Sequence, residues 1–140
     1  MATDGSLYYS NIKQRRPYVA KRQDDGSWSA KPVAVEFEKH VFIMHVFIAP
    51  DQSFMLLDAR AEDSLGESDI YVAFPAPNGG WQTPINLGPD VNSTYGETCP
   101  SLSADGKYLF FSRYNEAGAV SQIYWVDAAV IEQARTTTGE

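Results

Sequence analysis

The chain has 140 residues, of which 44% are hydrophobic and 13% aromatic, and this composition excludes an intrinsically disordered protein. Most of the acidic residues behind the net charge of −7 lie after residue 39, where they would repel a phosphate backbone, so no nucleic-acid partner is expected. The longest apolar stretch, residues 41–50, is too short to span a bilayer, so we expect no membrane insertion.

The first unit of the chain, residues 1–36, is predicted to hold three short strands. A turn at Asp4-Gly5 precedes an aromatic run at residues 7–10, and a second run follows at residues 17–20. The third strand is expected near Trp28. Compared with the next unit, this one lacks the strand that should come before its first turn.

The middle unit, residues 37–90, is predicted to be a complete four-stranded antiparallel sheet. Turn residues separate its apolar runs, as in one blade of a propeller. In the first turn Gln52 occupies the position where glycine is usual, so we expect either another turn geometry or a left-handed residue there. The four strands are expected within residues 41–49, 53–58, 70–74 and 81–87.

The third unit, residues 91–127, is predicted to repeat three of these strands, at residues 99–103, 108–112 and 122–126. Asp105-Gly106 suits a tight turn in which the carboxylate accepts backbone N–H bonds and the glycine adopts a positive φ. Where a fourth strand should follow, Asp127 can cap a helix over residues 128–135.

An internal repeat connects the three units. Tyr18, Tyr71 and Tyr124 are spaced 53 residues apart, and Trp28 and Trp81 share this interval. Repeats of this length made of strands and turns are typical of propellers and solenoids. Three partial blades cannot close a ring, since propellers have about four to eight. We therefore expect the C-terminal portion of a larger propeller, or a protomer that closes by self-association.

Two turns, two strand segments and two linking stretches recur in order along the chain: residues 50–53 and 104–112, Asp69-Ile70-Tyr71 and Gln122-Ile123-Tyr124, and residues 81–92 and 97–103. These segments resemble the WD40-like PD40 repeats found in TolB-type propellers. The resemblance covers nearly all 140 residues and implies an all-β fold, a partial β-propeller of about three four-stranded antiparallel blades with a short C-terminal helix. The first and last of these blades are incomplete.

The repeat and the absence of a recognisable catalytic set predict a non-catalytic binding or scaffold module for protein or carbohydrate partners, without a cofactor. The resemblance implies a periplasmic or extracellular location, although residues 1–6 carry no secretion signal. Because propellers host many unrelated functions, part of a propeller-type hydrolase or lyase is the alternative.

The loop after the second middle strand is rich in carboxylates, and Asp63, Glu67 and Asp69 are candidate calcium ligands. The spacing does not match a calcium-binding loop between two helices, and a solvated connecting loop is the competing interpretation. Arg16 and Gln122 replace Asp69 in the other units, which favours a structural role: Asp69 is expected to bond to the loop backbone.

Cys99 is the single cysteine, so no internal disulfide is possible. A nucleophilic thiol needs a nearby base, and His45 occupies the matching position one unit earlier, with Glu97 as a further candidate. The competing interpretation, which we favour, is that Cys99 is a small buried apolar residue. His40 and His45 should point to opposite faces of a strand, so we expect no metal site at this pair.

Four residues where loops should converge are candidate ligand-binding residues: Arg60, Glu97, Arg113 and Tyr114. Arg60 and Arg113 each follow the second strand of a unit, so we interpret them as equivalent positions. For these two arginines, a salt bridge between adjacent blades is the alternative, and the favoured, interpretation.

Overall fold

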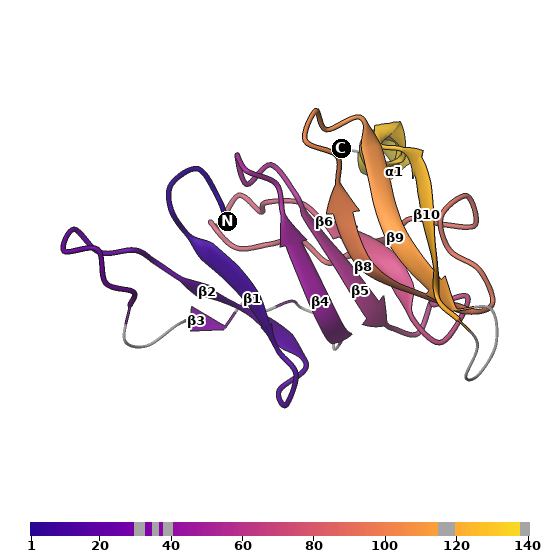
Figure 1. The fold of residues 1–140 in the computed structure, drawn as a ribbon, viewed down its shortest axis with the longest axis horizontal. Helices are drawn as coiled ribbons and strands as arrows, with labels where there is room; N and C mark the ends of the chain where they lie inside the picture. Colours follow the sequence, from indigo (N-terminus) through magenta and orange to yellow (C-terminus); the bar gives the residue numbers. More distant parts are fainter. Residues whose placement is uncertain (30–32, 35–36, 38–40, 115–119, 138–140) are drawn as a thin grey trace.

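The computed structural model describes residues 1–29, 33–34, 37, 41–114 and 120–137. These residues form three antiparallel sheets, which follow one another along the chain as shown in Figure 1, and one short helix. The sheets have the strand orders β1-β2-β3, β4-β5-β6-β7 and β10-β9-β8. The elements are β1 (Leu7–Asn11), β2 (Arg16–Ala20), β3 (Val33–Ala34), β4 (Phe42–Ile48), β5 (Met55–Arg60), β6 (Asp69–Ala73), β7 (Ile85–Asn86), β8 (Gly96–Leu102), β9 (Tyr108–Tyr114), β10 (Gln122–Asp127) and α1 (Ala129–Thr137).

The predicted all-β class is confirmed, and the sheets contain three, four and three strands as expected. The third strand of the first sheet is Val33–Ala34 and does not lie near Trp28 as predicted, since Trp28 makes an isolated bridge to Arg22. The last strand of the middle sheet is shorter than predicted, because only Ile85 and Asn86 pair with β6. Pro84 directly before them has no N–H to donate to a ladder, and Trp81 makes only an isolated bridge to Pro75. No helix among the described residues is long and apolar enough to cross a membrane.

The turns follow the chemistry predicted for them. Asp105 Oδ1 accepts the N–H of Lys107 at 3.2 Å, and Gly106 has a φ of 72°. In the matching turn of the middle sheet Gln52 adopts the left-handed conformation, with a φ of 59°. Hydrogen bonds from Ser53 and Ser103 hold the pKa values of Asp51 and Asp105 below the usual range.

The predicted C-terminal helix is present as α1, and Asp127 caps it by accepting the N–H of Ala129 at 2.8 Å. Ile131 and Ala134 bury their side chains in the same apolar cluster as Phe74 of the middle sheet. The helix therefore packs against the middle sheet as well as following β10.

The core lies in two layers between the sheets. Tyr71 of β6 faces the first sheet, in a cluster with Tyr8 and Val19. Val72, the next residue, points the other way and joins the cluster that the middle sheet forms with the third sheet and α1, which includes Tyr124. The middle sheet is thus buried on both faces.

Each of the two contacts between neighbouring sheets contains a backbone hydrogen bond, and the two bonds join matching positions. The N–H of Ile43, second residue of β4, donates to the carbonyl of Arg15 just before β2, at 3.1 Å. The N–H of Glu97, second residue of β8, donates to the carbonyl of Ser68 just before β6, at 2.7 Å. Each sheet is therefore set against the preceding one in the same way at this point.

Candidate functional site

Three side chains with metal-binding or catalytic chemistry meet between the middle and third sheets: His45 from β4, Asp58 from β5 and Cys99 from β8. A ring nitrogen of His45, a carboxylate oxygen of Asp58 and the Cys99 Sγ lie within 4.8 Å of one another. This is the one such group of three or more His, Cys, Asp or Glu side chains in the part of the chain that the structure describes.

Irregular backbone places two of these residues. The register of β4 shifts between Ile43 and His45, and that of β8 shifts between Thr98 and Ser101, on either side of Cys99. Cys99 itself has a φ of 55°, which an L residue with a side chain rarely adopts. These bulges re-aim both side chains out of the regular strand alternation.

Asp58 is fully buried and ties the two sheets together. Its Oδ1 accepts the backbone N–H of His45 at 2.6 Å, and its Oδ2 accepts the backbone N–H of Cys99 at 2.8 Å. The same Oδ2 lies 2.6 Å from Nδ1 of the His45 ring. A carboxylate only accepts hydrogen bonds, so Nδ1 of the ring is the donor in this contact.

The structure changes two expectations about this cluster. Cys99 is exposed, so its interpretation as a buried apolar residue is wrong. The carboxylate beside His45 is that of Asp58 and not of Glu97, which bonds elsewhere. The sequence feature that could have identified Asp58 as a site residue is an acidic residue inside the apolar run of β5. His40, the other histidine considered for a metal site, lies outside the described residues.

Glu97 and Arg113 are held in an ion pair within the third sheet. They are cross-strand partners, and Arg113 Nε donates to Glu97 Oε1 at 2.6 Å. Glu97 is fully buried and also accepts bonds from Ser93, while Arg113 donates to the carbonyl of Val91 at 2.8 Å. The pair therefore joins two strands of one sheet to the segment before β8, and does not form the predicted bridge between two sheets.

Arg60 and Arg113 are not equivalent positions, which corrects a further expectation. Leu57 pairs with Tyr71 and Phe111 pairs with Tyr124, so Ala59 is the counterpart of Arg113 and Arg60 that of Tyr114. A shift of one residue moves a side chain to the other face of a strand. Arg60 and Tyr114 are both exposed, at the ends of β5 and β9.

The acidic loop is organised by its own hydrogen bonds. Asp69 is buried and accepts the N–H groups of Leu65 and Gly66, as predicted for a bond to the loop backbone. Asp63 accepts the hydroxyl of Tyr71 at 2.9 Å, and Glu67 is exposed. Among the residues described, these three carboxylates do not converge on one point as a group of potential metal ligands.

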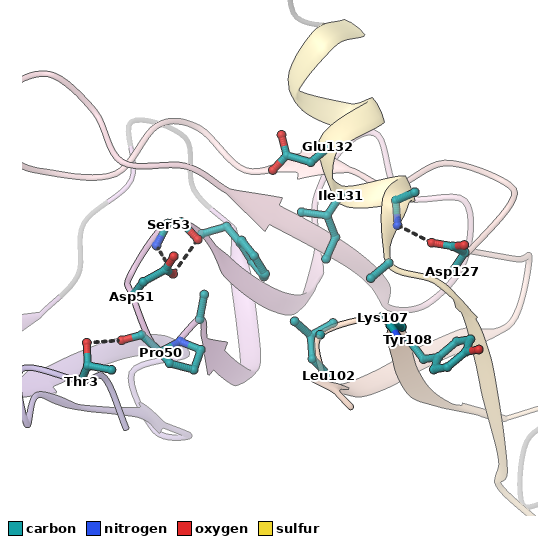
Figure 2. A pocket seen from close by; sticks show the side chains of 15 residues that line it. Thr3, Pro50, Asp51, Ser53, Leu102, Lys107, Tyr108, Asp127, Ile131 and Glu132 are labelled. Carbon is teal, nitrogen blue, oxygen red and sulfur yellow. Dashed lines mark hydrogen bonds between the residues drawn. The ribbon is translucent and has the colours of Figure 1, made fainter. Parts of the chain in front are cut away.

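A groove of about 660 Å³ opens at the other end of the strands, between the turns of the middle and third sheets and the start of α1. Figure 2 shows Asp51 and Ser53 on one side of it and Ile131 and Glu132 of the helix on the other. The carboxylate of Asp51 is bonded to Ser53 within its own turn. None of the four residues predicted to bind a ligand lines this groove.

No protein-family model matches the chain, and no curated protein or solved structure is similar to it by comparison of sequence or fold.

Proposed function

We propose that this chain is part of a β-propeller of the PD40 type and serves as a non-catalytic scaffold and binding module. The observation that carries the proposal is the matching hydrogen bond between successive sheets, from Ile43 to Arg15 and from Glu97 to Ser68. Sheets that stack face to face with one repeated contact are the arrangement from which propellers are built.

The partner that the two outer faces fit is a further sheet of the same kind. On the first sheet Tyr9 and Tyr18 stack with ring centroids 6.0 Å apart, on the face opposite to Tyr8. On the third sheet Ile123 and Trp125 are 75% and 62% exposed. In the middle sheet the corresponding faces are buried against a neighbour, so both outer faces are suited to protein contact.

The purified chain is therefore expected to self-associate as its concentration rises, because each outer face can pack on the other face of a second copy. Trp125→Lys should weaken this association at least about tenfold, since a charge then replaces a large apolar contact. Size-exclusion chromatography with light scattering measures the mass at each concentration.

Leu65→Lys is the matched control, because Leu65 is also an exposed apolar residue, 47% accessible, but lies in the loop before β6. It should associate as the unmodified chain does. A chain that stays monomeric throughout, or equal effects of the two lysines, would contradict the proposal.

A propeller-type hydrolase or lyase is the second candidate, favoured by the exposure of Cys99 beside a histidine that Asp58 orients. On this hypothesis iodoacetamide should label Cys99 faster in the native protein than in the unfolded chain, and His45→Ala should remove the difference. Equal or slower labelling of the native thiol would eliminate the one nucleophile this function has.

A further inference from the structure

We propose that His45, Asp58 and Cys99 form a binding site for a divalent transition-metal ion of the zinc class. This site is independent of the scaffold function, because it needs only the contact between the middle and third sheets. An imidazole, a carboxylate and a thiol are the three side-chain types that bind zinc in proteins. Calcium and magnesium prefer sets made of oxygen alone, so the thiol and imidazole select against them.

The distances among the three groups suit one ion. Zinc lies about 2.0–2.3 Å from its ligand atoms, so these atoms are roughly 3.2–3.8 Å apart in a tetrahedral site. In this protein all three lie within 4.8 Å of one another. His45 and Cys99 are both exposed, so their side chains can turn to close the remaining gap, and the ion then takes the place of the proton between Nδ1 of His45 and Oδ2 of Asp58.

The backbone around the cluster holds the three residues in position. The carboxylate of Asp58 is anchored by N–H groups from both other residues of the site, so it cannot turn away from them. The imidazole of His45 is oriented by the same carboxylate, and Cys99 is presented on a bulge with a left-handed backbone. Such prior ordering lowers the entropic cost of binding.

Three protein ligands leave one position of a tetrahedral ion free, and the exposure of His45 and Cys99 places that position toward solvent. Binding releases one proton per ion, that of the Cys99 thiol. Once Nδ1 of His45 binds the ion, the ring carries its proton on the exposed Nε2 and stays neutral, while Asp58 binds as the carboxylate, so neither changes its net charge.

Cobalt(II) is the probe that tests the site, because a thiolate bound to cobalt gives a charge-transfer band in the near ultraviolet. Titration of the reduced full chain should give this band with one ion per chain, and added zinc should abolish it. Cys99 is the single cysteine of the sequence, so the band reports on this residue alone.

Two variants and one control separate the site from adventitious binding. Cys99→Ser should remove the band, and His45→Ala should weaken cobalt binding at least about tenfold, as loss of ligand support does in metal sites. Asp63→Asn removes an exposed carboxylate outside the cluster and should bind cobalt normally. Circular dichroism checks that each variant is folded.

Absence of the band in the folded chain, a band insensitive to His45→Ala, or one ion per two chains would overturn the proposal. The last result would mean that Cys99 thiols from two molecules share the ion. None of these outcomes bears on self-association, which is measured without metal, so failure of this site and failure of the scaffold function are distinguishable.

Discussion

Replacing Asp58 by alanine is expected to lower the free energy of unfolding by about 3–5 kcal/mol. Asp58 is fully buried, and its two oxygens accept the backbone N–H groups of His45 and Cys99 together with the His45 ring. Alanine leaves these donors without an acceptor and removes the link between β5 and β8. Urea denaturation followed by circular dichroism measures the change.

Asp105→Ala is the control for this prediction, since Asp105 also accepts backbone and hydroxyl hydrogen bonds but lies in an exposed turn. Its loss should have a much smaller effect because water replaces the carboxylate. Asp58→Asn keeps one acceptor oxygen and should fall between the wild-type chain and Asp58→Ala. If Asp58→Ala were as stable as Asp105→Ala, the carboxylate would not be holding the sheets together.

Gly66→Ala is expected to cost about 3 kcal/mol or more, because the added methyl group has no space. A Cβ at Gly66 would lie 1.8 Å from the carbonyl oxygen of Tyr95 and 2.7 Å from that of Ser93, and both atoms belong to the backbone. The loop cannot move aside freely, since the N–H of Glu67 donates to the Tyr95 carbonyl at 2.8 Å and Asp69 binds the N–H of Gly66.

Gly80→Ala provides the matched comparison, as the nearest atom to its Cβ is the Asn78 side-chain oxygen at 3.2 Å, in an exposed turn where a small shift of this side chain costs at most its hydrogen bond from the Gly80 N–H. The same urea denaturation should show Gly80→Ala close to the wild-type chain. Equal stability of the two alanine variants would mean that residues 93–95 can move away from the loop at little cost.

Features of local chemistry were predictable. Short apolar runs bounded by turn residues located strands such as β5 and β6, and the turn at Asp105-Gly106 and the cap at Asp127 follow from hydrogen bonds between near neighbours. The left-handed backbone at Gln52 was one of the two expected solutions for a turn without its glycine. Each of these depends on residues close together in the chain.

Local patterns gave the wrong prediction for the pairing register of the strand ends. Arg60 and Arg113 both follow apolar strands, yet pairing with β6 and β10 makes Arg60 the counterpart of Tyr114. The connection from β5 to β6 and that from β9 to β10 differ in length by one residue, and one residue exchanges the two faces of a strand. Apolar patterns cannot detect such a shift at the exposed end of a strand.

The sequence by itself determined the all-β class, the order of strands and turns, and the capped C-terminal helix, because these depend on short-range periodicity and side chains next to the backbone they bond. The repeat put His45 and Cys99 at matching positions, but only the tertiary structure decided that they meet and that Asp58 joins them. They lie on three strands of two sheets, and their convergence requires bulges in β4 and β8 and a buried carboxylate that accepts bonds from both. Contacts of this kind depend on how whole sheets pack, which no local pattern encodes.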